Sequence, residues 1–273
     1  IFFFHRFIYY IFSYIIKLSI RFFTKKAKKC YYRYMKYLCF GEILVDRIEG
    51  RDYPGGASLN LSVHLSRLGS EVFLFSGLGK DSEGQMLLDV VRKEGVREDF
   101  LVLDSSHKTG LSLIKVDREG LPDFEIKTDT AFDNLTLKEE DLQRLKDKQI
   151  DCLCFGTLIQ RNEISRRTLQ ELVRGSGAKK KFCDLNLRKK CFDKESVLFS
   201  LENCDILKIN KDELAYLQKS FFPQTSKTQD LLNSIREKYS IEVLLLTMGE
   251  KGSLSCYEGG MIELAAPKAK VAD

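Results

Sequence analysis

The sequence predicts an α/β protein in which helices cover both faces of a mostly parallel sheet. Short apolar runs alternate with segments of helical periodicity from residue 35 to about residue 95, and again from residue 151. Such a strand, helix, strand order needs crossover connections and is typical of parallel sheets. Between about residues 109 and 128 the pattern changes to two strands around a turn, which predicts a small β insertion.

The first half contains two strand and helix pairs. The run "YLCFGEILV" is a strand candidate, and "ASLNLSVHLSRLG" predicts a helix with leucines on one stripe and Gly69 at its end. "EVFLFSGLG" is the next strand, followed by a helix that Gly95 ends. Strands near 43–53 and 109–128 form the predicted small sheet, and their alternation suits a lid exposed on one face.

The second half repeats the alternation. Its predicted elements are the strand "DCLCFGTL", helices near 163–174 and 193–201, the strands "KKFCDLNL" and "CDILKI", a helix from Asp212, a helix carrying Leu231, Leu232 and Ile235, the strand "IEVLLLT" and a hairpin about Gly259 and Gly260. We find no internal repeat and no linker. One α/β domain with a lid is therefore predicted.

The net charge of +5 does not indicate a nucleic-acid partner. Residues 1–34 contain eight basic residues and no acidic one, so residues 35–273 carry a net charge of −3. A negative domain repels a phosphate backbone at long range. We therefore expect no nucleic acid among its partners.

The aromatic and basic leader, residues 1–34, allows three interpretations. A membrane anchor or signal segment is one, although charged residues interrupt the apolar run and no small-residue cleavage site is evident. An amphipathic surface helix is the second. We favour the third, upstream DNA translated in frame, because "MKYLCFGEILVD" leads from a start-like Met35 straight into a buried-strand pattern. The folded domain would then be residues 35–273.

The eight cysteines form no Cys-x-x-Cys pair and no Cys/His cluster. Cys152, Cys154 and Cys183 lie inside apolar, strand-like runs, where cysteine behaves as a small hydrophobic residue. This usage favours a reducing compartment over a disulfide framework. We expect a cytoplasmic protein, with a membrane partner only if the leader is real.

Several polar residues follow predicted strands, each with an ordinary structural alternative. "YPGGASLN" places Gly55 and Gly56 before a helix and Asn60 one turn inside it, which suits an oxygen-rich ligand or simply a tight turn. Asp46 ends the first predicted strand. "DLNLR" directs Arg188 outward from a strand end, where a guanidinium suits anionic oxygens.

Two later loops have the same ambiguity. In "KINKDEL", Asn210 and Glu213 are three residues apart across a helix start, which suits hydrated Mg²⁺ near phosphates or an ordinary capping box. "TMGEKG" follows the most apolar strand at the end where open α/β sheets bind ligands.

In combination these segments resemble the ribokinase/PfkB family of carbohydrate kinases, and within it the fructokinase-like branch. "GEILVD", "PGGASLN", "GLGKDSEG", "DLNLR", "LKINKDEL" and "LLTMGEKGS" occur in the family's order, and the resemblance covers almost all of residues 35–273. It implies a ribokinase-like three-layer α/β/α sandwich with a β-sheet lid. It also implies transfer of the ATP γ-phosphate, with Mg²⁺, to a sugar hydroxyl, fructose first among candidates.

The resemblance assigns roles to matching positions. Asp46, Gly55, Gly56, Asn60 and Arg188 would bind the sugar. Asn210, Thr247, Gly249 and Gly252 would bind the nucleotide, and Glu213 would organise Mg²⁺ through water. The lid is also a candidate surface for a homodimer.

The end of the sequence departs from the family pattern. The chain stops at Asp273, directly before the position of the family's Gly-Ala-Gly-Asp motif. The resemblance matches Asp273 to a monovalent-cation position, which implies K⁺. The Asp of that motif is the family's general base, and acid-base catalysis contributes about 10² to 10⁴ in rate. We therefore expect the C-terminal part of the fold to be missing and the chain as given to have little or no turnover.

Two rival hypotheses remain at this point. A non-catalytic sugar-binding or regulatory relative would bind sugar without nucleotide, and a membrane-tethered protein depends on the leader alone. The lid residues by themselves do not rank fructose, another ketohexose, 2-keto-3-deoxygluconate and ribose, so fructose is favoured by the resemblance alone.

Overall fold

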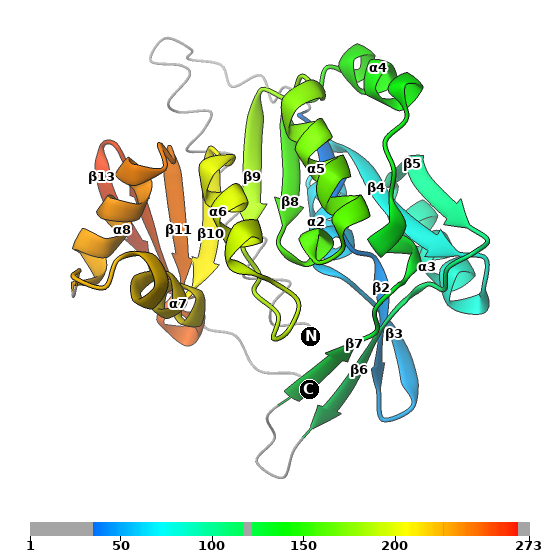
Figure 1. The fold of residues 1–273 in the computed structure, drawn as a ribbon, viewed down its shortest axis with the longest axis horizontal. Coiled ribbons are helices and arrows are strands. Elements are labelled where there is room, and N and C mark those ends of the chain that lie inside the picture. The colour runs from blue at the N-terminus through cyan, green and yellow to red at the C-terminus, as the bar shows by residue number, and fades with distance from the viewer. Residues whose placement is uncertain (1–34, 117–121, 226, 267–273) are drawn as a thin grey trace.

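A computed structural model describes residues 35–116, 122–225 and 227–266 and shows two sheets (Figure 1). The large sheet has nine strands in the order β13-β12-β11-β10-β9-β8-β1-β4-β5, and the small sheet has four in the order β3-β2-β6-β7. The strands from β5 to β11 in this order pair in parallel, and β12 and β13 continue the sheet as an antiparallel hairpin.

The strand bounds are as follows. The large sheet contains β1 (Lys36–Phe40), β4 (Glu71–Gly79), β5 (Arg97–Asp104), β8 (Cys152–Gly156), β9 (Lys180–Asp184), β10 (Ile206–Asn210), β11 (Val243–Thr247), β12 (Ser253–Tyr257) and β13 (Gly260–Leu264). The small sheet contains β2 (Leu44–Ile48), β3 (Arg51–Gly55), β6 (Gly110–Val116) and β7 (Pro122–Ile126).

Helices cover the large sheet on both faces, which confirms the predicted three-layer fold. They are α2 (Ala57–Arg67), α3 (Ser82–Lys93), α4 (Glu139–Lys148), α5 (Glu163–Gly175), α6 (Lys194–Glu202), α7 (Lys211–Phe221) and α8 (Thr228–Lys238), with short 3₁₀ turns η1 (Ala131–Asn134), η2 (Leu158–Gln160) and η3 (Gly249–Lys251). Leucines of α2 and α3 join one buried cluster, and those of α4 to α8 join the other.

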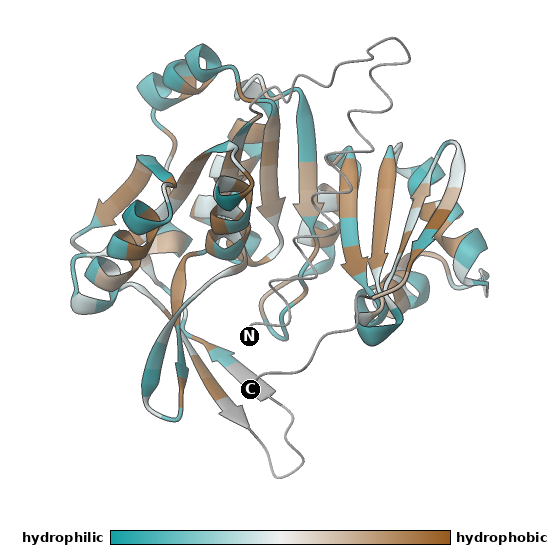
Figure 2. Ribbon diagram, turned by 180° about the vertical axis from the view of Figure 1, so that it is seen from behind, coloured by the Kyte–Doolittle hydropathy of each residue, from teal (hydrophilic) through white to brown (hydrophobic). Residues whose placement is uncertain are grey.

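Alternation along the central strand explains the two clusters. In β1, Tyr37 and Cys39 pack on the side of α2, whereas Leu38 and Phe40 pack on the opposite side. Successive side chains of a strand point to opposite faces, so a strand buried on both faces is apolar throughout. Figure 2 shows this apolar character along the central strands of the large sheet.

The first predicted strand is wrong in one respect. "YLCFGEILV" divides into β1 of the large sheet and β2 of the small sheet, with Gly41 to Ile43 between them. Asp46 therefore lies in the middle of β2 and not at a strand end of the large sheet. Both halves are buried and apolar, so the hydrophobic pattern contains no signal for the change of sheet.

Two elements between residues 96 and 150 were not predicted. Helix α4 buries only Leu145 among its ten residues, so it lacks an apolar stripe. Strand β5 is the edge of the large sheet and exposes much of its length. Both elements lack the burial that produces a readable periodicity.

The aromatic contacts of β1 give a test of this packing. Phe40 is fully buried and meets Phe75 edge to face, with ring centroids 5.1 Å apart. Phe40→Ala is expected to lower the free energy of unfolding by about 3–5 kcal/mol. Leu103→Ala, at a 50% exposed position of β5, should change it by less than about 0.5 kcal/mol. Urea unfolding measures both, and equal losses would contradict the assigned core.

Candidate functional site

Polar side chains gather where the parallel strands of the large sheet end. Glu42 follows β1, Asp184 ends β9, and Asn210 and Thr247 end the neighbouring strands β10 and β11. Asn210 and Thr247 are direct cross-strand partners. Carboxyl ends of parallel strands share one edge, and open α/β sheets bind their ligands at that edge.

The small sheet brings Asp46 to the turn that precedes α2. A Cβ on Gly55 would lie 2.2 Å from Asp46 Oδ2, so the missing side chain leaves the space that the carboxylate occupies. Gly56 has φ 101°, and a Cβ there would lie 2.5 Å from the carbonyl oxygen of Glu42. Asn60 follows in the first turn of α2, where its backbone N–H donates to the Gly56 carbonyl at 3.0 Å. The structure thus brings Asp46, both glycines and the start of α2 together.

Glu42 is a site residue that the sequence analysis missed. Its side chain is buried, and Oε1 accepts a hydrogen bond from the Ala57 backbone N–H at 2.9 Å. Burial raises the pKa of Glu42, and the positive charge of Arg188 acts against this rise. In the sequence Glu42 looked like part of a continuous strand. Its place in the site becomes visible only in the structure, where the chain turns between β1 and β2.

The positive charge of Arg188 affects the pKa of one residue in the small sheet and of one in the large sheet. Burial raises the pKa of Asp46, while the Ser112 side chain and the charge of Arg188 oppose the rise. The same guanidinium disfavours the charged form of Lys208 on the other side. Because such effects need proximity, the charge of Arg188 is close enough to act on both Asp46 and Lys208.

A buried charged cluster stands at the ends of β9 and β10. Lys208 Nζ donates to Asp184 Oδ1 at 2.9 Å and to Oδ2 at 3.2 Å. Lys208 and Glu213 are 8% and 3% exposed. Burial alone lowers the pKa of Lys208, but Asp184 and Glu213 raise it overall. Lys208 was not predicted, because within the strand pattern it resembled a solvent-facing residue.

Asn210 and Glu213 form the capping box that the sequence allowed. Asn210 Oδ1 accepts from the Glu213 backbone N–H at 2.9 Å, and Glu213 Oε2 accepts from the Asn210 N–H at 2.8 Å. Glu213 Oε1 also accepts from the Leu187 N–H at 3.0 Å. Glu213 therefore joins α7 to the loop that carries Arg188.

The oxygen groups of this cluster suit a hydrated cation and not a direct metal cage. Within residues 35–116, 122–225 and 227–266, no group of three His, Cys, Asp or Glu side chains is arranged to hold a metal. Both Glu213 oxygens already accept backbone hydrogen bonds. Mg²⁺ keeps several waters and takes phosphate ligands, so Glu213 fits it through water.

The loop after β11 separates the two predicted nucleotide glycines. Gly249 has φ 63° and no atom within 4 Å of its Cβ position, so it borders open space. Gly252 has φ 93°, and a Cβ there would lie 1.9 Å from the Leu264 carbonyl oxygen. Thr247 Oγ1 donates to the Ile209 carbonyl at 3.3 Å. Gly252 is thus required by the close approach of β13, whereas Thr247 and Gly249 stand at the edge itself.

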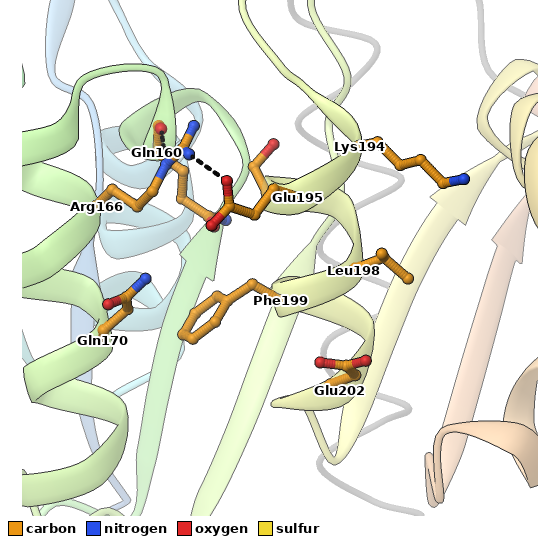
Figure 3. Close-up of a pocket in the computed structure, with 9 residues that line it drawn as sticks. Gln160, Arg166, Gln170, Lys194, Glu195, Leu198, Phe199 and Glu202 are labelled. Atoms are coloured by element: carbon orange, nitrogen blue, oxygen red, sulfur yellow. Dashed lines mark hydrogen bonds and ion pairs between the residues drawn. The ribbon is translucent and has the colours of Figure 1, made fainter.

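Asp273, the predicted monovalent-cation residue, falls outside the described residues. A hollow of about 450 Å³ lies between α5 and α6 (Figure 3). Its Arg166 is paired with Glu195 at 3.3 Å and with Asp193 at 2.5 Å. None of the predicted site residues lines it.

The fold and this edge are those of open α/β proteins, which bind ligands at the carboxyl ends of their parallel strands. The chain belongs to the pfkB family of carbohydrate kinases, since the profile described as pfkB family carbohydrate kinase matches residues 29–273. The fructokinase of Salmonella typhimurium is 28% identical over 239 residues, which cover 82% of this chain. Across three curated relatives, the chain spans 62% to 74% of the relative's length.

Solved structures share the fold. The ATP-bound fructokinase of Xylella fastidiosa superposes with a TM-score of 0.75 at 21% identity, covering 88% of this chain and 77% of that one. A double mutant of Vibrio cholerae fructokinase, crystallised with fructose, ADP and potassium ion, superposes with a TM-score of 0.72 at 20% identity, covering 87% of this chain and 77% of that one.

In the part of the chain that the structure describes, no helix is long and apolar enough to span a membrane.

The buried lysine gives a prediction with a pH dependence. Burial and Asp184 raise the pKa of Glu213, and Lys208 opposes them. Lys208→Met should therefore raise that pKa further and cost about 3–5 kcal/mol of unfolding free energy near neutral pH. A carboxyl whose folded pKa exceeds its unfolded pKa destabilises the fold once ionised, so the loss should shrink as pH falls through the raised pKa.

Urea unfolding at about pH 5 and about pH 8 measures this dependence. Lys180→Met is the matched control, because it removes a partner of Glu242 in a surface pair and should cost less than about 1 kcal/mol. A loss in Lys208→Met that is small, or that grows as pH falls, would contradict the buried cluster.

The two positive-φ glycines of the small-sheet turns give a matched pair. Gly50→Ala is expected to cost about 1–2 kcal/mol from backbone conformation alone, because nothing lies within 4 Å of its Cβ position. Gly56→Ala has the same backbone cost plus a collision with the Glu42 carbonyl, worth a further ~1–3 kcal/mol. Equal losses in urea unfolding would show that the turn before α2 is looser than described.

Proposed function

We propose that this chain binds a sugar and ATP at the shared edge of its two sheets, and that the sugar is fructose. The observation that supports the sugar side most directly is the Asp46 carboxylate over Gly55, beside the start of α2. A carboxylate held near backbone amides and a guanidinium offers the acceptors and donors that hydroxyl groups require. The curated relatives named fructokinase and the fructose in the Vibrio cholerae structure favour fructose among sugars.

The residues would divide the work as follows. Asp46, Asn60 and Arg188 would hold sugar hydroxyls, and the missing side chains at Gly55 and Gly56 would let the ligand approach the backbone. The small sheet would act as a lid that excludes water. Asn210, Thr247 and Gly249 would line the nucleotide phosphates, with Gly252 shaping their loop. When bound, Mg²⁺ would neutralise charge on the transferring phosphoryl group, and Glu213 would orient its waters.

Little or no turnover of residues 1–273 stays a prediction. The general base expected from the family resemblance would follow Asp273, and Asp273 itself, the expected K⁺ position, lies outside the described residues. Release of ADP in the presence of fructose, ATP and Mg²⁺ measures turnover directly. Sugar binding without nucleotide binding would instead favour the non-catalytic relative.

We also propose that the protein is cytoplasmic and that it forms a homodimer. Seven described cysteines are buried and unpaired in disulfides, which supports a reducing cytoplasm. The division into residues 1–34 and a domain of residues 35–273 stays a prediction, because residues 1–34 are not among those described. A homodimer through the small sheet is supported by the exposed Tyr53 of its edge strand β3, and sedimentation measures it.

The test of the sugar site is calorimetric titration with fructose. Asp46→Asn should weaken affinity by about 10- to 100-fold, since hydrogen bonds to a charged group contribute about 1.5–3 kcal/mol. Affinity of the unaltered chain should fall as pH falls through the raised pKa of Asp46, because the protonated carboxyl loses acceptor capacity.

Asp52→Asn is the matched control, because this carboxylate lies on the neighbouring strand β3 and pairs with Arg47 at 2.5 Å, outside the turn. Its affinity for fructose should stay within about twofold of the unaltered chain. Equal affinities in Asp46→Asn and the unaltered chain would remove Asp46 from the sugar site.

A further inference from the structure

Arg161 lies where the small sheet returns to the large one. It follows η2, which begins beyond the carboxyl end of β8. Its Nη2 donates to the carbonyl oxygen of Lys127, directly after β7, at 2.6 Å. Its Nε and Nη2 donate to Asp133 of η1 at 2.7 Å each. One guanidinium therefore joins the end of β7 to the segment that follows it.

The position of this guanidinium is tightly fixed. The Arg161 and Asp133 side chains are 8% and 1% exposed. Asp133 Oδ2 also accepts from the backbone N–H and the hydroxyl of Thr130, at 2.9 Å each. The guanidinium lies over the ring of Phe132, 4.8 Å from its centroid. A buried bidentate pair with a stacked face allows little freedom of orientation.

The same side chain reaches the loop that carries Arg188. Nη1 of Arg161 contacts Cys191 Sγ at 3.9 Å. The Cys191 backbone N–H donates to the carbonyl oxygen of Arg188 at 2.9 Å. Residues 188–191 thus form a turn whose far end touches Arg161. The end of β7, η1 and this turn all contact the Arg161 guanidinium.

The entry into the small sheet is anchored elsewhere. Thr109, directly before β6, donates from its backbone N–H and its hydroxyl to Asp81, the N-cap of α3, at 3.0 and 2.6 Å. The Ala131 N–H donates to the Lys108 carbonyl at 2.8 Å and so links the entry to the exit. The entry is thus fixed to α3, and the contact with the Arg188 turn comes from the exit.

We propose that Arg161 is a positioning residue that couples the exit of the small sheet to the turn carrying Arg188. The small sheet and the Arg188 guanidinium then approach a bound sugar as one unit. The proposal rests on the proposed function for the sugar, but the coupling itself is a property of the folded chain. A lysine at this position would keep the charge and lose the planar fork that reaches three segments.

Hydrogen exchange measures the coupling without any ligand. In Arg161→Lys, backbone amides of residues 123–128 and of residues 185–191 should both exchange about 10-fold faster, within the range of ordinary coupling free energies. The matched control is Arg166→Lys, a second largely buried arginine, whose guanidinium donates to Asp193 and to the Gln160 carbonyl. It should affect the end of η2 and the start of α6, and neither residues 123–128 nor residues 185–191.

Two exchange results would overturn the proposal. In one, Arg161→Lys speeds exchange in residues 123–128 but not in residues 185–191. In the other, both arginine variants give the same exchange pattern. Should Arg161→Lys fail to fold, Cys191→Val tests the weaker contact while keeping a small apolar side chain. It should speed exchange in residues 185–191 by about 2- to 10-fold and leave residues 123–128 unchanged. No change in residues 185–191 would overturn the coupling.

Sugar titration tests whether the coupling positions the site. Arg161→Lys should bind fructose about 10-fold more weakly than the unaltered chain, and Arg166→Lys should stay within about twofold. Unchanged affinity in Arg161→Lys, despite faster exchange in both segments, would overturn its positioning role. Failure of the unaltered chain to bind fructose or ribose would instead overturn the proposed function, and the exchange comparison would still decide the coupling.

Discussion

The arrangement of the candidate site depends on one buried ammonium group. Asp184 and Glu213 are close enough that Asp184 raises the pKa of Glu213, so without a cation the two carboxylates would repel each other in a poorly solvated place. Lys208 supplies that cation from the middle of β10. Glu213 accepts hydrogen bonds from the backbone of both Asn210 and Leu187, and the nearby ammonium opposes the rise in its pKa. The charges of Lys208, Asp184 and Glu213 together therefore hold the start of α7 against the loop after β9.

A second constraint is how closely the chain can approach itself where the two sheets join. A Cβ on Gly77 of β4 would lie 2.4 Å from the Ala131 carbonyl oxygen, and one on Gly110 would lie 2.7 Å from the Phe132 ring. Both missing side chains leave room for η1 against β4 and the start of β6. This contact brings Phe132 and Asp133 under Arg161. The small sheet therefore depends on glycines that do not belong to the ligand site.

The fold could be predicted from the sequence wherever burial produces a regular spacing of hydrophobic residues. The site could be predicted only where its residues are close together in the sequence. The capping box of Asn210 and Glu213 and the glycines before α2 are local features, and the structure shows both. Glu42 and Lys208 were missed because their importance comes from neighbours far away in sequence. The division of "YLCFGEILV" between two sheets was missed for the same reason, since hydrophobic patterning records burial and not the identity of the partner strand.

The electrostatics of the edge give a reason for the small sheet and Arg188 to move together. Burial already raises the pKa of both Asp46 and Glu42, and Arg188 opposes the rise at each. Closure of the small sheet over a sugar would remove more water and raise the cost of keeping these carboxylates ionised. If the sheet closed without Arg188, that cost would oppose closure. A connection through Arg161 that brings the guanidinium along keeps an opposite charge beside the carboxylates, so closure can strengthen their hydrogen bonds to hydroxyl groups without isolating a charge.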